Sequence, residues 1–502
     1  MVNAGCDVDS RVITNVKKPN IVFIITDDQS PFTLSAYGNE ICNTPNIDRL
    51  VLEGMSLSSA YHMGSWRSAV CIPSRIQIMT GKHVWHTLGL ATNHIDTTEG
   101  SVANDLIERN RNAARDLMPA LFNQAGYVTF RTCKKGTSYA AANKLFKHNY
   151  ERWCVHADDT SGSKWHGDRA VEFLDRQNAL QEEKPFLIYM GFSHPHDPRH
   201  EKVEFYQKYG AHDKPPAEPN PLAPPLPINY LSQHPFRHGN DNGRDEVRVQ
   251  GVMSRRDEAT IRNEIGRNYA CIENIDNQVG RVLEKLAEIG EVENTFIFFA
   301  SDHGIAIGRH GLTGKQNLYE HSWRVPMIVK GPGIKQSSTA PGNIYLMDVL
   351  PTICEMTGMD VPSTCDGLSF LPVLRGEKEV VRDVLYGVFN IFAEHLGGSG
   401  NGSRPGIRAV RSGKWKLIKY DVYNGAVRET QLFNLETNPN ELLVQHQDLN
   451  IIRMTGNVPD PNQVDLAEDD QFADKLEELE DLLLQEQKKY GDPYRLWNQI
   501  GK

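Results

Sequence analysis

The fold of this chain is decided by one stretch, Ile21-Val22-Phe23-Ile24-Ile25-Thr26-Asp27-Asp28. Its five consecutive large apolar residues are typical of a strand buried on both faces, as in the middle of a parallel sheet. Two adjacent carboxylates follow directly. In open α/β sheets, ligands bind beyond the carboxyl ends of the strands. The stretch therefore predicts a central strand that delivers polar groups to a site.

Two further runs have the same continuous apolar character, and a long helical pattern lies between them. Its apolar residues recur at helical spacing, which predicts a helix that packs on the sheet and ends near Gly290. Alternating strands and helices of this kind predict an α/β fold with helices on both faces of a large sheet. The two runs are 186–190 and 296–300, and the helical stripe is Ile261, Ile265, Tyr269, Ile272, Ile275, Val279, Val282 and Leu286.

A second predicted strand also ends on polar residues, Asp302 and His303. An aspartate at such a place can simply cap a following helix. Two adjacent carboxylates at Asp27 and Asp28 repel each other, however, and a cation is the simplest compensation. We therefore expect these four residues to form one metal site. Oxygen-rich ligation favours a hard cation, Ca²⁺ or Mg²⁺, although imidazole is a softer donor.

Composition excludes several classes of protein. The 502 residues carry a net charge of −10, which argues against nucleic-acid binding, and no run is long enough to predict a transmembrane segment. The eight cysteines are too dispersed for a disulfide framework or a Cys-x2-Cys zinc site. Cys354 and Cys365 can bridge in an oxidising compartment, but two buried thiols are the default expectation.

A distinctive motif starts at Cys71, which is followed by Ile72-Pro73-Ser74-Arg75 and apolar residues up to Thr80-Gly81-Lys82. If a helix begins at Pro73, Cys71 and Arg75 lie on one face a turn apart. The guanidinium can then bind an oxyanion at residue 71. The alternative is a buried structural cysteine. The segment resembles the Cys-x-Pro-Ser-Arg motif of the sulfatase family, in which the cysteine is oxidised to formylglycine after translation.

The resemblance extends over nearly the whole chain, and the shared motifs occur in family order. It implies an alkaline-phosphatase-like fold, a maturation partner (a formylglycine-generating or an anaerobic sulfatase-maturing enzyme) and a calcium ion at the four residues above. His303 stands where the family commonly has Asn or Gln. The hydrated aldehyde at residue 71 attacks sulfur, and collapse of the hydrate later expels sulfate. The resemblance assigns sulfate binding to Lys315, aligns Lys134 with the catalytic lysine of the family's Gly-Lys-x-His motif, and assigns the role of general acid to His196, with His194 as the second candidate.

One position departs from the family pattern. Gly136 stands where sulfatases usually have the histidine of a Gly-Lys-x-His motif, which is thought to assist sulfate elimination. The substitutes that the sequence offers are Lys135, Ser138, His83 and His86.

The chain divides into three predicted regions: a tail at 1–19, a catalytic domain at 20–385 and a C-terminal subdomain at 386–502. The last is predicted to contain a short antiparallel sheet, including 415–420 and 432–435, and a final helix. A proline-rich surface segment at 215–227 and a Gly-rich loop at 397–402 are expected between regular elements.

We interpret the chain as a sulfatase acting on a sulfated sugar or polysaccharide. A phosphonate monoester or phosphodiester hydrolase of the same superfamily and a catalytically silent glycan-binding homologue are the alternatives. Trp66, His194, Arg199 and His310 are the predicted substrate contacts. The start Asn3-Ala4-Gly5-Cys6 resembles the end of a bacterial lipoprotein signal, which implies a periplasmic, outer-membrane lipoprotein or secreted enzyme with Cys6 acylated; an ordinary disordered N-terminus is the alternative.

Overall fold

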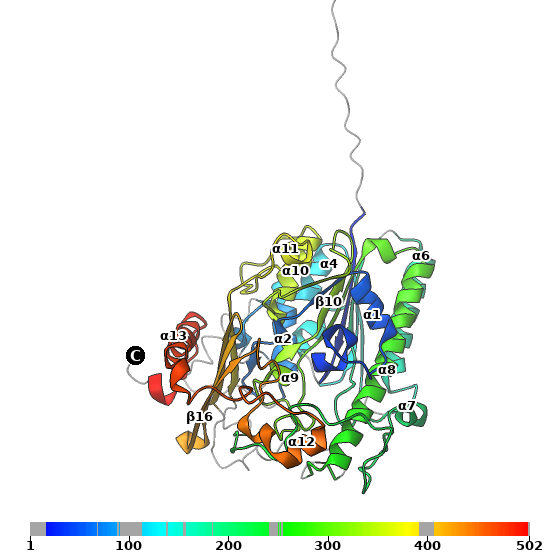
Figure 1. Ribbon diagram of the computed structural model, residues 1–502. Helices are drawn as coiled ribbons and strands as arrows, with labels where there is room; N and C mark the ends of the chain where they lie inside the picture. Colours follow the sequence, from blue (N-terminus) through cyan, green and yellow to red (C-terminus); the bar gives the residue numbers. More distant parts are fainter. Residues whose placement is uncertain are drawn as a thin grey trace, which may run out of the picture.

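The computed structural model describes residues 17–67, 69–87, 90, 113–136, 139–153, 157–182, 184–239, 249, 251–252, 255–390 and 406–499. The predictions for Cys6, Ser138 and the loop at 397–402 lie outside the described residues. Figure 1 shows a large sheet with helices on both sides and a second sheet beside it.

The main sheet has eight strands in the order β11-β2-β10-β8-β1-β7-β5-β6. The predicted central strand is β1, and it pairs in parallel with β7 and with β8. The strand β10 pairs antiparallel with β8, so the sheet is mixed. The bounds are β1 Asn20–Thr26, β2 Met55–Leu57, β5 Val128–Lys134, β6 His148–Arg152, β7 Phe186–Gly191, β8 Thr295–Ser301, β10 Met327–Lys330 and β11 Ser338–Ala340.

Helices cover both faces of this sheet, as predicted (Figure 1). Side chains of β1 alternate between two apolar clusters. Val22 and Ile24 pack with α1, α6 and α8, whereas Ile21, Phe23 and Ile25 pack with α2, α4, α10 and α11. The continuous apolar run is thus explained by burial on both faces. The helices are α1 Pro45–Leu52, α2 Cys71–Thr80, α4 Met118–Gln124, α6 Ser163–Leu180, α8 Glu258–Glu288, α10 Val349–Met356 and α11 Leu371–Leu374.

The long helix α8 confirms the helical stripe, because every residue of the stripe is buried. The side chain of Asp257 accepts from the backbone N–H of Thr260 and caps its start. Gly290 follows its end with a φ of 71°, which a glycine adopts without strain. The helix α2 begins at Cys71 rather than at Pro73, so the reactive position is inside the first turn.

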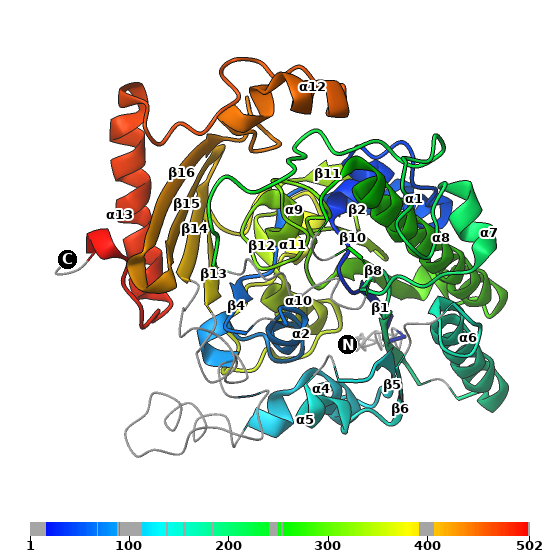
Figure 2. The ribbon, with the colours of Figure 1, turned by 90° about the horizontal axis from the view of Figure 1, so that it is seen from below.

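A second sheet contains β13 Val384–Asn390, β14 Gly406–Ser412, β15 Trp415–Val422 and β16 Val427–Asn434. Its order is β16-β15-β14-β13-β4, and the predicted C-terminal strands are confirmed as β15 and β16. The helix α13 (Ala473–Lys489) covers its outer side (Figure 2). The strand β4 (Gly64–Ser65) joins β13 from a distant part of the sequence, which was not predicted. The boundary at residue 385 stays a prediction.

The remaining elements are short: β3 Ala60–Tyr61, β9 Arg324–Val325, β12 Ile344–Tyr345, α5 Ala140–Asn143, α7 Val203–Lys208, α9 Glu320–Trp323 and α12 Leu449–Thr455. Residues 215–227 form neither helix nor strand, as predicted. Both Cys354 and Cys365 are free thiols. No helix in the described ranges has the length and apolarity that a membrane crossing requires.

Candidate active site

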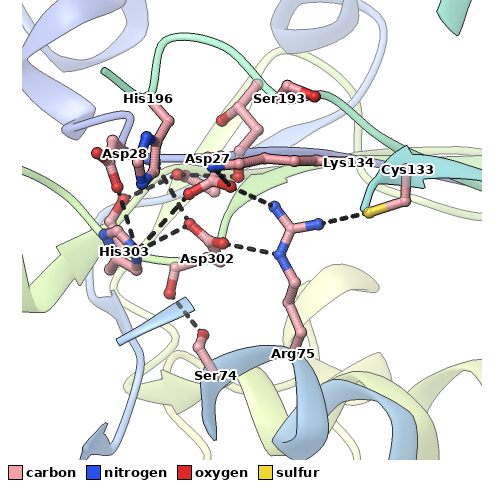
Figure 3. Close-up of polar contacts among 12 residues, drawn as sticks. Asp27, Asp28, Ser74, Arg75, Cys133, Lys134, Ser193, His196, Asp302 and His303 are labelled. Atoms are coloured by element: carbon pink, nitrogen blue, oxygen red, sulfur yellow. Dashed lines mark hydrogen bonds and ion pairs between the residues drawn. The ribbon is translucent and has the colours of Figure 1, made fainter. Parts of the chain in front are cut away.

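Strand ends bring the candidate residues together at one edge of the main sheet (Figure 3). The register pairs Thr26 of β1 with Ser301 of β8, so Asp27 and Asp302 leave neighbouring strands side by side. Lys134 is the last residue of β5 on the other side of β7. Parallel pairing therefore places residues from distant parts of the sequence at one edge.

Three carboxylates and one imidazole converge there. His303 Nε2 lies 3.3 Å from Asp28 Oδ1, 3.4 Å from Asp302 Oδ1 and 4.0 Å from Asp27 Oδ1. All four side chains are completely buried. His303 Nδ1 lies 3.0 Å from the carbonyl oxygen of Gly304, which indicates that Nδ1 carries the proton. The lone pair of Nε2 then faces the carboxylate oxygens.

This arrangement fits a bound cation. Asp27 Oδ1, Asp28 Oδ2 and His303 Nε2 are buried without hydrogen-bond partners among the described residues. Ligand atoms of Asp27, Cys71, Asp302 and His303 lie within 4.8 Å of one another. Oxygen and nitrogen lone pairs that face each other out of water are costly, and a cation between them removes the cost. The chain thus provides the donors that the sequence predicted.

Cys71 lies next to this group as the first residue of α2 and is 3 % exposed. Burial, reinforced by the charge of Asp27, raises the pKa of its thiol to about 12. Only the thiolate is an effective nucleophile. An unmodified Cys71 is therefore unsuited to attack at neutral pH in this environment.

Arg75 lies one turn after Cys71 and joins three groups. Its Nε donates to Asp302 Oδ2 at 2.8 Å, Nη1 donates to Cys133 Sγ at 3.1 Å, and Nη2 lies 3.6 Å from Asp27 Oδ2. The guanidinium is completely buried. It is thus a fixed positive charge beside residue 71.

Two lysines add positive charge. Lys134 Nζ lies 3.3 Å from Asp27 Oδ2, and Lys315 Nζ donates to Asp28 Oδ1 at 2.6 Å. Burial alone would raise the pKa of Asp28, but the charges of His196 and Lys315 hold it well below its usual value. Asp28 is therefore ionised, as cation binding requires.

His196 approaches from the loop after β7. Its Nδ1 lies 2.8 Å from both the carbonyl oxygen and Oδ1 of Asp197. This orients the ring and leaves Nε2 for other partners. Ligand atoms of Asp27, Asp28 and His196 also lie within 4.8 Å of one another. The imidazole thus borders the cation site (Figure 3).

The sequence matches the family model described as Sulfatase over residues 19–359, which is more than half of the chain. The chain belongs to the sulfatase family. Residues 308–459 also match the model described as the C-terminal part of N-sulphoglucosamine sulphohydrolase. Sulfuric ester hydrolysis is accordingly the activity of this chain.

Curated and solved relatives agree with this assignment. An N-acetylglucosamine-6-O-sulfatase of Bacteroides thetaiotaomicron is 25 % identical, with 95 % of this chain and 87 % of the relative covered. A structure in complex with its substrate D-glucosamine-2-N,6-O-disulfate has a TM-score of 0.68 at 22 % identity, covering 95 % of this chain and 99 % of the other. A phosphonate monoester hydrolase of Agrobacterium radiobacter has a TM-score of 0.67 at 17 % identity, covering 94 % and 96 %. At these identities the two structures establish the alkaline-phosphatase-like fold alone.

The predicted substrate contacts differ from the metal donors, because they bind other parts of the chain. Arg199 Nη1 forms an ion pair with Glu264 at 3.1 Å, and Trp66 Nε1 donates to Thr87 at 3.1 Å. His310 stacks on Tyr319 with ring centroids 3.9 Å apart. Arg199, Trp66 and His310, like His194, are at most 1 % exposed. Their roles as substrate contacts stay predictions.

Two of the proposed substitutes for the missing histidine lie far from residue 71. His83 and His86 follow the other end of α2, where His86 Nδ1 lies 2.8 Å from Asp366 Oδ2. Ten helical residues span roughly 15 Å. Lys135 is exposed in the turn after β5, and Gly136 beside it has a φ of 84°. The geometry thus argues against His83 and His86.

Three residues of the site were missed. Cys133 contacts Arg75, Asp197 orients His196, and Ser74 Oγ donates to the carbonyl oxygen of Asp302 at 2.5 Å. Ser74 and Asp197 adjoin predicted residues, so their positions offered a signal. Cys133 adjoins predicted Lys134 as well, but its contact with Arg75 depends on how β5 lies relative to α2.

Proposed function

We propose that this sulfatase hydrolyses a sulfate ester of a sulfated sugar, with formylglycine made from Cys71 and with Ca²⁺ held by Asp27, Asp28, Asp302 and His303. The observation that carries the proposal is the convergence of four buried metal donors and three fixed cations beside residue 71. The sugar is supported by the N-acetylglucosamine-6-O-sulfatase and by the disulfated glucosamine complex among the relatives.

The two absent groups supply defined chemistry when present. Ca²⁺ supplies charge neutralisation and polarisation of oxygen ligands, and formylglycine supplies a hydroxyl nucleophile that a buried thiol cannot replace. Cys71 is well placed for both groups, because it lies at the start of a helix and against the metal donors.

The chain's own residues do the rest. Lys134, Lys315 and Arg75 provide buried positive charge around the place of the sulfate oxygens, where charge develops during transfer. Since these groups are already fixed by aspartates, they need little reorganisation. His196 is held by Asp197 with Nε2 available, and it donates a proton to the oxygen of the leaving alcohol. The residue that assists sulfate elimination stays unassigned.

The experiment is a parallel assay of the matured enzyme on defined sulfated mono- and oligosaccharides, an aryl sulfate and an aryl phosphonate monoester. We expect turnover of at least one sulfated sugar that exceeds the phosphonate rate. Faster phosphonate turnover would overturn the substrate class in favour of the phosphonate hydrolase. Fully modified protein that turns over none of the esters would favour the silent glycan-binding alternative.

Conversion of Cys71 to formylglycine by a maturing enzyme and a location in the bacterial envelope are proposed from the sequence alone. Modification of Cys71 is tested by the mass of the peptide that contains it, after expression with and without a maturing enzyme. A location in the bacterial envelope is tested by metabolic acyl labelling of the chain and of Cys6→Ser. An unlabelled native chain would contradict acylation of Cys6.

A further inference from the structure

A second group of metal-type donors lies behind the catalytic loop. It consists of His194 and Glu201, which flank His196, and Cys271 of α8. Their ligand atoms lie within 4.8 Å of one another. The three residues are 1 %, 4 % and 0 % exposed, respectively. None of them carries out a step of the reaction proposed above.

His194 has one buried ring nitrogen without a partner. Nδ1 lies 3.2 Å from Ser163 Oγ, whereas Nε2 is buried without a hydrogen bond to any residue that the structure describes. If Nδ1 donates to Ser163, Nε2 carries a lone pair. Metal-binding histidines commonly have this pattern, in which the other ring nitrogen is held by a hydrogen bond.

Glu201 is oriented in a similar way. Its Oε2 accepts from Asn274 Nδ2 at 2.9 Å, and its Oε1 accepts from the backbone N–H of Lys202 at 2.9 Å. Burial raises the pKa of Glu201 to about 7. Burial also raises the pKa of the Cys271 thiol, and the charge of Glu201 reinforces this effect. The Glu201 carboxylate and the Cys271 thiolate thus have no positive charge within the group to balance them.

We propose that His194, Glu201 and Cys271 form a second metal site, separate from the Ca²⁺ site, which binds Zn²⁺. Nitrogen, oxygen and sulfur are the donors that zinc prefers, whereas Ca²⁺ takes oxygen. Binding requires Cys271 to lose its thiol proton to solvent, and the thiolate and the Glu201 carboxylate then balance the charge of the ion.

The surroundings provide an entry path. A cavity of about 550 Å³ is lined by Glu201 together with His200, Lys202, Asp213, Lys214 and Arg267. Three protein ligands leave one position of a tetrahedral ion for water from this side. The ion would link the segment 194–201, which carries His196, to α8. It would thereby fix the position of the general acid without contacting substrate.

The test measures zinc content and cobalt spectra of the full chain. Because Cys71 is also close to metal donors, the background is Cys71→Ser. We expect about one zinc per chain after dialysis. With Co²⁺, we expect a thiolate-to-cobalt charge-transfer band in the near ultraviolet. Both signals are lost in Cys271→Ser and Glu201→Gln, and both persist in Cys42→Ser, the matched control for another buried cysteine that contacts α8.

Each other result overturns the proposal. Zinc content that is unchanged by Cys271→Ser places the ion elsewhere. A cobalt band that disappears in Cys71→Ser alone assigns the thiolate to the catalytic site. If Cys271→Ser does not fold, the Glu201→Gln variant, which keeps the thiol, tests the site instead. A folded Glu201→Gln chain that binds zinc with full affinity would exclude Glu201 as a ligand. The test does not depend on sulfatase turnover, so it can fail independently of the proposed function.

Discussion

At the scale of single residues, the site depends on side chains that bind several partners at once. Arg75 connects the two acidic strand ends, because its planar head reaches Asp302, Asp27 and Cys133 together. An ammonium group keeps the charge but cannot reproduce this fork.

We expect Arg75→Lys to lower kcat at least about 100-fold and to destabilise the fold by about 3 kcal/mol, since it breaks a fully buried ion pair. The measurements are aryl sulfate turnover and urea denaturation at fixed Ca²⁺. The control is Lys164→Met, which removes a partly exposed ion pair with Asp168 and should change neither quantity. Wild-type turnover in Arg75→Lys would contradict the role of the fork.

Asp197 sets the orientation of His196, and its effect should depend on the leaving group. Asp197→Asn keeps the shape but removes the carboxylate that accepts from Nδ1. We expect the rate on a sugar sulfate to fall about 100-fold, because an alkoxide needs a proton to depart. The rate on an activated aryl sulfate should fall much less. Equal losses on both substrates would show that His196 is not the general acid.

At the scale of elements, the local sequence predicted the strands and helices that have a periodic apolar pattern and the polar residues that follow a strand end. The apolar run of β1 and the stripe of α8 are both buried as expected, since each pattern reflects one environment along the element. The metal donors come together because they directly follow paired strands.

The sequence was a poorer guide to elements and side chains whose position depends on contacts with distant parts of the chain. The strand β4 has two residues and no pattern of its own, yet it extends the C-terminal sheet. Arg199 and His310 resemble exposed binding residues in the sequence but are buried against Glu264 and Tyr319. Charge and aromaticity do not reveal burial, because a partner elsewhere in the chain can satisfy them.

The C-terminal sheet is connected to α9 through a buried ammonium. Lys416 of β15 lies 2.9 Å from Glu320 and 2.7 Å from Glu441, and its side chain is completely buried. Although burial opposes ionisation, Lys416 holds the pKa of Glu320 at about 2, while burial raises that of Glu441 to about 6. One ammonium therefore compensates mainly one carboxylate.

We expect Lys416→Met to lower the free energy of unfolding by about 3–5 kcal/mol, because Glu320 loses its main counter-charge. Lys414→Met is a matched control two residues away in the same hairpin. Its ion pair with Glu436 is exposed, so it should cost less than about 1 kcal/mol. Urea unfolding of both variants measures the two losses of unfolding free energy. Equal losses would contradict the connection between β15 and α9.

At the scale of the whole molecule, buried neutral histidines determine the response to acid. Burial lowers the pKa of His62, His166 and His194 to about 3 each. In the unfolded chain they titrate near 6.5. Between these values the unfolded state binds more protons than the folded state, so acidification favours unfolding. Buried acids with raised pKa values, such as Glu201 at about 7, act in the opposite direction.

His166 allows this to be tested at a histidine that is a ligand of neither proposed metal site. Its ring is buried between the hydroxyls of Thr132 and Ser193, and burial together with His194, Arg75 and Arg131 opposes its protonation. We expect His166→Gln to reduce the fall in unfolding free energy between pH 6 and pH 5 by about 1 kcal/mol. Between pH 7.5 and 8.5 the curves of variant and wild type should be parallel, because the imidazole is neutral in both states there. Denaturation at saturating Ca²⁺ across this range measures both slopes. A slope that is unchanged below pH 6 would mean that His166 takes up its proton in the folded protein, and acid sensitivity would then have to arise from other groups.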